Sequence, residues 1–195
     1  MIILLRSLEI NDEEIIQALS RRILSKQEKN GAWKLFYDED EGNLTATVEA
    51  YYALLYSGYV KKTDPNMRLA RQFILKNGGQ KNIHMFAKFM LALTGQYKWP
   101  RHFPVPIEMI LLPINFPVNF FDFSMGARAN LTPILIAADY QFSLKTKRSP
   151  DLSDLCLKRE DNDWDDREFY HLRSIFPPIQ HGIKSLLGFS RELHE

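Results

Sequence analysis

The segment from Ile83 to Leu93 (IHMFAKFMLAL) constrains the fold more than any other part of the chain. Nine of its eleven residues are apolar, and only one histidine and one lysine interrupt them. A surface helix carries a single apolar stripe, whereas a helix that is apolar on every side is covered by other helices. We therefore expect a helix from Lys81 to about Thr94 at the centre of a helical domain.

The residues that follow are also apolar, but prolines interrupt them. Five prolines stand in the segment from residue 99 to residue 117: Pro100, Pro104, Pro106, Pro113 and Pro117. Proline lacks an amide proton and blocks the preceding helical turn, so only a short helical turn from Ile107 to Leu112 is expected there. A second apolar helix is predicted from Phe123 to Phe142, with a bend at Pro133. This arrangement indicates a domain that holds or passes something hydrophobic.

The remaining predicted helices are amphipathic and have recognisable ends. They run from Asp12 to Gln27, from Leu44 to Ser57, from Pro65 to the Gly78–Gly79 pair, and from Pro177 to Leu193. Asn43 and Asp64 are the expected N-caps of the second and third of these helices. No window alternates with a period of two, so the sequence predicts an all-α fold of stacked antiparallel helix pairs.

Composition bounds the class of protein. The chain has 195 residues, 45% of them hydrophobic, and a net charge of +1, which fits one globular domain without a basic surface for nucleic acid. The first apolar run is too short for a signal peptide, and no stretch approaches the roughly 20 apolar residues that span a bilayer. A single cysteine, Cys156, fits a reducing compartment. We expect a cytoplasmic protein, at most peripheral on the cytoplasmic membrane.

The residues that usually carry chemistry form no familiar constellation. The histidines are scattered without metal-ligand spacing: His84, His102, His171, His181 and His194. Glycine-rich phosphate loops and GxSxG are missing from the sequence, so we expect no metal and no cofactor. Cys156 lies in a charged segment without a paired histidine and is not an expected nucleophile.

A more specific pattern is Gln27-x-x-x-Gly31-x-Trp33 at the end of the first long helix. It is compatible with an ordinary helix C-cap followed by a core tryptophan. The block QEKNGAW also resembles the QW motif of the triterpene cyclases. GNLTATVEAYYALLYSGY, GGQKNIHMFAKFMLALTGQYKWP and NFFDFSMGARANLTPILIAADYQF are similar to consecutive blocks of the squalene–hopene cyclase family. The resemblance extends from about Gln17 to Phe142 and is nearest to the sporulenol synthase (tetraprenyl-beta-curcumene cyclase) branch.

This resemblance implies an enzyme of two α/α barrels (toroids) that sits monotopically on the membrane. Such an enzyme folds and cyclises a linear isoprenoid, and aromatic side chains stabilise the carbocations. The matched region corresponds to part of the N-terminal barrel. Residues 1–142 are then the N-terminal part of an incomplete barrel, 143–168 a charged loop, and 169–195 a C-terminal helical segment of the same domain.

The family starts cyclisation with an aspartic acid of a DxDD motif in the other barrel. Residues Asp163 to Asp166 (DWDD) match that motif in letters, but they lie within the charged run LKREDNDWDDREF. A carboxyl that protonates an alkene needs a dry pocket and a tuned partner. We therefore expect no catalytic residue in this chain, and Asp165→Asn should leave any substrate-dependent property unchanged. The sequence leaves open whether the chain is itself an enzyme.

Three positions are expected near the substrate by resemblance. Phe123 corresponds to an aromatic residue of the substrate entrance and Leu131 to an apolar channel position. Gly126 stands where the family has an aromatic residue that shapes the cavity. Plain core packing is the alternative for Phe123 and Leu131.

Taken together, the sequence predicts a truncated squalene–hopene or sporulenol-type cyclase that supplies part of an isoprenoid cavity and is inactive alone. The alternative is an isoprenoid-binding or docking module that works with a separately encoded C-terminal half. The apolar segment from Phe103 to Phe121 is expected to contact a membrane or a partner, including a second copy, or to be a buried connector. A carbohydrate-active enzyme would need two inward carboxyls, and only Glu49, Glu108 and Asp122 lie in apolar segments.

Overall fold

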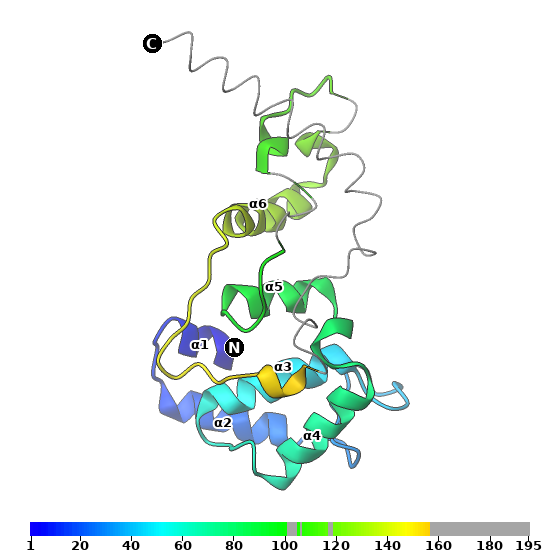
Figure 1. The fold of residues 1–195 in the computed structure, drawn as a ribbon, viewed down its shortest axis with the longest axis vertical. Coiled ribbons are helices and arrows are strands. Elements are labelled where there is room, and N and C mark those ends of the chain that lie inside the picture. Colours follow the sequence, from blue (N-terminus) through cyan, green and yellow to red (C-terminus); the bar gives the residue numbers. More distant parts are fainter. Residues whose placement is uncertain (101–104, 106, 117–118, 157–195) are drawn as a thin grey trace. The chain divides into compact units, whose positions relative to one another are not determined.

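The computed structural model describes residues 1–100, 105, 107–116 and 119–156 (Figure 1). Within these ranges the secondary structure is helical, and the β-type pairing is limited to a single bridge between Trp33 and Asn43. The predicted all-α class is therefore confirmed. The chain divides into two compact units. Unit 1 contains residues 1–98 and returns at Ser143, and unit 2 contains the described residues between Trp99 and Phe142.

Unit 1 holds five α-helices and two short 3-10 helices (η). They are α1 (Ile2–Ser7), α2 (Glu13–Leu24), α3 (Leu44–Ser57), α4 (Pro65–Lys76), η1 (Gly79–Asn82), α5 (Met85–Leu93) and η4 (Ser153–Leu155). Unit 2 holds η2 (Ile107–Leu111), η3 (Phe120–Asp122) and α6 (Met125–Asp139). The helical turn predicted after residue 106 is therefore present as η2.

The central helix of unit 1 is α3, so the prediction that the helix near residues 83–93 would be central was wrong. α3 is contacted by α1, α2 and α4 (Figure 1), and nine of its fourteen residues are buried. α5 instead leaves Phe86 exposed and buries Lys88. The signal for α3 was hidden because three of its buried residues are tyrosines, which pack like apolar side chains yet count as partly polar.

Helix ends follow the capping residues. The Asn43 side chain accepts a hydrogen bond from the Ala46 amide at 3.0 Å, and α3 ends at Gly58, whose φ is 84°. Both bounds of this helix agree with the prediction. Asp64 precedes α4 as predicted, but its carboxylate accepts from the Lys61 amide at 2.8 Å rather than from the helix.

Residues 143–156, which we call the strap, return the chain to unit 1 after unit 2. The Leu144 amide donates to the Leu93 carbonyl at 2.7 Å, and the hydroxyls of Tyr56 and Thr146 are 2.6 Å apart. Leu152 and Leu155 are buried. The strap is a loop apart from η4, as expected for a polar segment, but it is packed against unit 1. The rest of the predicted loop, and the predicted helical segment 169–195, lie outside the described residues.

Candidate functional site

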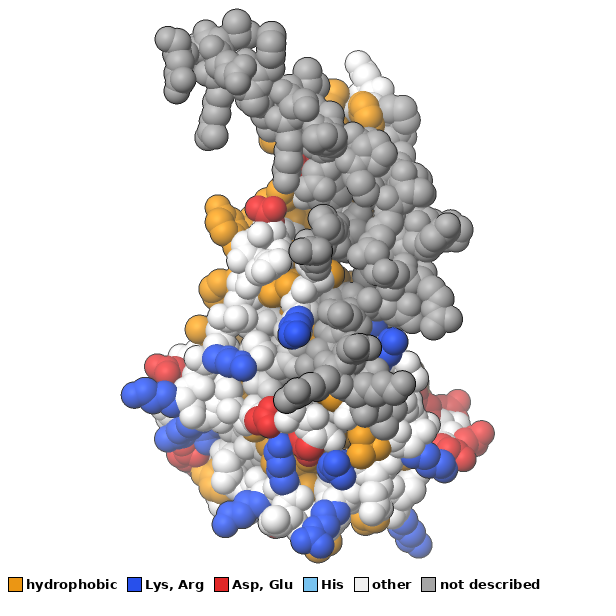
Figure 2. All heavy atoms as spheres, viewed as in Figure 1, with side chains coloured by type: hydrophobic (Ala, Val, Ile, Leu, Met, Phe, Trp, Pro, Cys, Tyr) orange, Lys and Arg blue, Asp and Glu red, His pale blue; other side chains and the backbone are white. Residues whose placement is uncertain are grey.

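Unit 2 presents large apolar side chains to solvent. Near η2, η3 and the start of α6, side chains that are more than half exposed include Leu111 at 66%, Ile114 at 70%, Phe121 at 52% and Met125 at 78%. Hydrophobic side chains also stand at the surface over α6 (Figure 2). Apolar patches of this kind mark sites that contact a ligand, a membrane or another protein.

A small core supports this surface from within unit 2. Met109 and Leu112 are buried, and Phe123 packs against them. The Asn119 side chain accepts from the Phe121 amide, and Asp122 accepts from the Asn119 amide, so a capping box fixes η3. Phe123 is therefore held in place by core packing on one side, and it remains half-buried.

The three predicted channel residues do not lie on one surface. Leu131 is half-buried, on the side of α6 that buries Leu135 and Ala138. Gly126 is exposed on the opposite side, and a Cβ added there would meet nothing within 4 Å. The structure thus separates Gly126 from Leu131, because five residues of a helix with 3.6 residues per turn rotate by about 140°. An aromatic side chain at position 126 would fit without a clash.

The turn that contains Gln27, Gly31 and Trp33 joins three helices of unit 1. The Gln27 amide donates to the Gly31 carbonyl at 3.0 Å and to the Asn66 carbonyl, in the first turn of α4, at 2.8 Å. The indole of Trp33 donates to the Ile23 carbonyl at 2.8 Å. The Ile23 carbonyl lies in the last turn of α2, and the two Gln27 bonds join the turn to the start of α4, so the turn has a structural role in the geometry seen here.

Gly31 meets a strict steric demand in this turn. Its φ is +89°, and an added Cβ would lie 2.4 Å from the carbonyl carbon of Leu69. Only glycine combines a left-handed backbone with such a close approach to α4. The backbone of this turn therefore requires a glycine at position 31, where the Gln27 side chain reaches its carbonyl.

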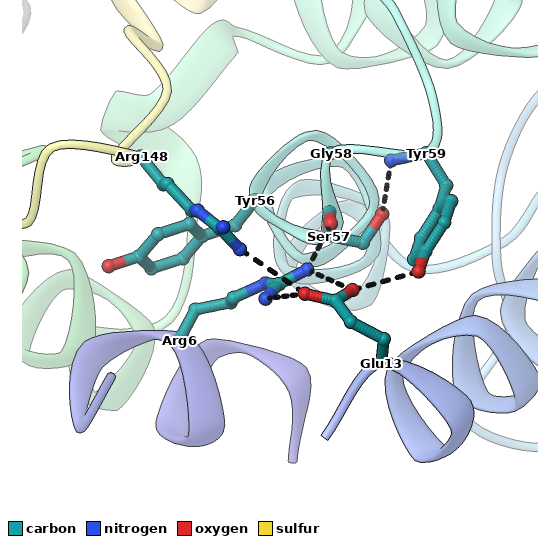
Figure 3. A pocket seen from close by; sticks show the side chains of 7 residues that line it. All are labelled: Arg6, Glu13, Tyr56, Ser57, Gly58, Tyr59 and Arg148. Carbon is teal, nitrogen blue, oxygen red and sulfur yellow. Dashed lines mark hydrogen bonds and ion pairs between the residues drawn. The ribbon is translucent and has the colours of Figure 1, made fainter. Parts of the chain in front are cut away.

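A polar pocket of about 430 Å³ lies in unit 1, between α1, α2, the end of α3 and the strap. Arg6, Glu13 and Arg148 point toward one another in it (Figure 3). The buried guanidinium of Arg6 donates to both Glu13 carboxylate oxygens at 2.8 and 2.9 Å and to the Ser57 carbonyl at 2.7 Å. Arg148 donates to Glu13 at 3.3 Å. Sequence patterns did not reveal this cluster, although a lone arginine in the apolar run IILLRSL was a signal that a buried partner was needed.

The pocket contains a hydrogen-bonded ion pair between Arg6 and Glu13, which we call the Arg6–Glu13 clasp. This pair is not an acid catalyst. Hydrogen bonds from Arg6, and then from the Tyr59 hydroxyl at 2.8 Å, lower the pKa of Glu13 from 4.5 to about 2. A carboxylate held in this way keeps its negative charge and has no proton to give at neutral pH. Glu13 is therefore unsuited to protonating an alkene.

The three acids considered for a carbohydrate-active enzyme have separate environments. Glu49 is half-buried on α3 of unit 1, and burial raises its pKa. Glu108 is buried in η2 of unit 2, and Asp122 is exposed and serves the capping box of η3. Glu49 therefore belongs to a different unit from Glu108 and Asp122, and the Asp122 carboxylate is engaged in capping η3.

The part of the chain that the structure describes has neither a cluster of metal ligands nor a helix that could cross a membrane. No group of three or more histidine, cysteine or acidic side chains there has the geometry of a metal site. Every helix there falls short of the length and hydrophobicity that a membrane crossing requires. The DWDD segment from Asp163 to Asp166 lies outside these residues.

The helical secondary structure of the described residues agrees with that of an all-α terpenoid cyclase N-terminal domain. The profile of the squalene-hopene cyclase N-terminal domain matches residues 1–191. This chain belongs to that family.

Curated relatives agree with the assignment. The chain is 39% identical to sporulenol synthase from Bacillus subtilis (strain 168) over 145 residues, which is 73% of this chain and 23% of that protein. It is 32% identical to squalene–hopene cyclase from Alicyclobacillus acidocaldarius over 140 residues, which is 72% of this chain and 22% of that protein. It is 38% identical to enfumafungin synthase from Hormonema carpetanum over 133 residues, which is 68% of this chain and 10% of that protein. The matched region thus spans less than a quarter of each of these relatives.

Proposed function

We propose that these 195 residues supply part of the hydrophobic cavity of a squalene–hopene or sporulenol-type cyclase. The observation that carries the proposal is the exposed apolar surface of unit 2, in a chain that belongs to this family. An isoprenoid chain has no polar groups, so an apolar wall is what would bind it. The acid that starts cyclisation would come from sequence that corresponds to the remaining three quarters of the relatives.

Two interactions of the described residues support a separation of substrate binding from acid catalysis in such an enzyme. Glu13 is held as a carboxylate, and the guanidinium of Arg128 lies 5.5 Å from the centre of the Phe121 ring in unit 2. A ring face that already carries a cation is a poor site for a second one, because the two positive charges repel each other. We infer that the described residues bind and shape the substrate without starting or stabilising the cationic reaction at Phe121.

Binding of squalene tests this function directly. Met125→Asp should weaken squalene binding at least tenfold, because a carboxylate on the apolar wall loses its hydration when the ligand covers it. Phe36→Asp is the matched control, since Phe36 is 68% exposed and belongs to a loop of unit 1. Equal affinities of the two variants and the parent would refute the assignment of the wall to unit 2.

We also propose the domain organisation that the sequence predicts. Residues 1–142 and 169–195 would form one incomplete α/α barrel, with the QW-type turn at Gln27, Gly31 and Trp33 closing one end of a helix pair. Phe123 and Leu131 would border the cavity, and Gly126 would leave a gap where relatives carry an aromatic side chain. Gly126→Trp should then be tolerated in folding, because nothing lies within 4 Å of its added Cβ, and should narrow the range of bound isoprenoids.

The second candidate function is a docking module that works with a separately encoded C-terminal half, on a membrane or as a pair of copies. The proline-rich stretch around η2 favours it, because Leu111 and Ile114 expose apolar side chains on a backbone that is not a long helix. Co-sedimentation with liposomes distinguishes the membrane version. Absence of binding, together with a monodisperse monomer in solution, would exclude both the membrane and the paired versions.

A further inference from the structure

A second surface of unit 2, on α6, is separate from the exposed side chains of η2 and η3. An open pocket of about 300 Å³ is lined by Pro133, Ile136, Ala137, Tyr140 and Phe142. Tyr140 is 78% exposed, Phe142 51% and Ile136 43%. The lining is apolar except for the Tyr140 hydroxyl, so some apolar partner is expected to cover it.

The side of α6 that carries this pocket also includes residues nearer the start of the helix. Gly126, Pro133, Ala137 and Tyr140 are spaced by seven, four and three residues, which places them on the same side of a helix. Gly126 and Ala137 are small, and the added Cβ at Gly126 would meet open space. From residue 126 to residue 140 this face is about 21 Å long. Small side chains along such a length leave room for another helix to approach closely.

One polar group on this face limits what can cover it. The Asn130 side chain is exposed and donates to the Gly126 carbonyl at 3.0 Å, and its amide oxygen remains available as an acceptor. Burial of this oxygen in lipid would leave it without a hydrogen-bond donor, which is costly. A helix that carries one hydroxyl in its apolar stripe can donate a hydrogen bond to this oxygen, whereas a lipid tail cannot.

The chain contains one segment with that pattern. The sequence predicts an amphipathic helix from Pro177 to Leu193, outside the described residues, with an apolar stripe of Ile179, Ile183, Leu186, Leu187 and Leu193. Ser190 falls on the same stripe, seven residues after Ile183. The stripe from residue 179 to residue 193 is also about 21 Å long. If Ile183 faces Ala137 in an antiparallel pair, Ser190 faces Asn130.

The residues between α6 and the C-terminal segment, 143–178, are long enough to allow this contact whichever way the two units are arranged. The strap of 14 residues keeps Cys156 within about 50 Å of Phe142, since an extended residue spans at most about 3.5 Å. The 22 residues from 157 to 178 reach about 75 Å by the same measure. The segment therefore reaches α6 of its own molecule, at an effective concentration in the millimolar range.

From these observations we infer that the C-terminal segment 177–193 docks as an antiparallel helix on the part of this face that runs from Asn130 to Tyr140. This helix pair is independent of the proposed isoprenoid wall around Met125, and it holds whether or not the protein binds squalene. It makes the α6 face from Asn130 to Tyr140 an internal interface of the domain and leaves Gly126 to the proposed cavity.

Disulfide trapping in the full chain tests the inference. In a Cys156→Ser background, two pairs should form intramolecular disulfides readily: Ala137→Cys with Ile183→Cys, and Asn130→Cys with Ser190→Cys. The matched control is Ala137→Cys with His181→Cys, because residue 181 lies on the opposite side of the predicted helix from residue 183. We expect at least tenfold faster closure for the first two pairs, independent of protein concentration.

Three outcomes would overturn the inference. Equal rates for the three pairs would show that the segment is not docked. Disulfides that form only between molecules would assign the face to a second copy. The Ala137→Cys thiol could also be protected from a maleimide reagent only when vesicles of neutral phospholipid are present. That result would assign the face to a membrane. On α6 the substituted residues are the small Ala137 and the exposed Asn130, so the variants at these positions are expected to fold.

Discussion

At the scale of single residues, Gly31 is the position where the backbone allows least change. The Gly31→Ala variant should lose about 3 kcal/mol of unfolding free energy, from a left-handed backbone and a clash with the Leu69 carbonyl carbon at 2.4 Å. Gly58→Ala is the control, because its φ is +84° but nothing lies within 4 Å, and it should lose only about 1 kcal/mol. Denaturant unfolding measures both values. Equal losses would contradict the close packing of the QW-type turn on α4.

The Glu13 carboxylate makes stability depend on pH in a defined direction. Its pKa is lowered in the folded protein, from 4.5 to about 2, first by the hydrogen bonds from Arg6. The contribution is therefore fully present above about pH 5 and is lost as the pH falls toward 2. Glu13→Gln should be less stable than the parent at pH 7, and the two proteins should converge near pH 2. A difference that stays constant from pH 7 to pH 2 would argue against the ionised clasp.

Two neighbouring tyrosines of α3 give a paired comparison. The Tyr51 hydroxyl donates to the Asp154 carboxylate at 2.9 Å, whereas the buried Tyr52 hydroxyl makes no well-formed hydrogen bond within the described residues and has the Thr94 hydroxyl near it. Tyr51→Phe should cost about 1 kcal/mol, and Tyr52→Phe should be neutral or stabilising, because it removes an unsatisfied polar group. Thermal unfolding of the two variants distinguishes them, and the reverse order would contradict the described contacts.

At the scale of elements, Asp154 joins the end of the strap to three side chains of unit 1. Its carboxylate accepts from Tyr51, pairs with Lys62 at 2.6 Å and lies 3.4 Å from Arg71. Asp154→Ala should release the strap and raise the rate of amide hydrogen exchange over residues 144–156 by tenfold or more, with less effect on α3. Asp151→Ala is the control, because Asp151 bonds only to Ser153 within the strap. The same exchange rates in both variants would show that Asp154 does not anchor the strap.

The elements also show what could be predicted from the sequence. The bounds of α3 followed from Asn43 and Gly58, because capping depends on residues adjacent in the chain. α1 was not predicted, since its six residues are too short for a helical period and are stabilised by packing Ile2 against Ile16 and Ala53. The central position of α3 and the packing of the strap also depend on contacts between distant residues. Such contacts leave no local pattern.

At the scale of the whole molecule, the sequence identified the family but not the geometry of the site. Blocks such as GARANL are similar to the family in order and spacing, which made the resemblance specific. They did not show that Gly126 and Leu131 lie on opposite sides of α6, or that Phe123 packs into a small core. The Arg6–Glu13 clasp was missed for the same reason, because its carboxylate and carbonyl acceptors come from α2 and α3.

The central claim is that this chain provides an isoprenoid-binding wall without the acid that starts cyclisation. The most direct measurement is conversion of squalene to cyclised product by the purified chain, alone and together with the remainder of sporulenol synthase expressed as a separate polypeptide. We predict no product from the chain alone, product from the mixture, and no change in that product with Asp165→Asn. Cyclised product from the chain alone, abolished by Asp165→Asn, would contradict the account.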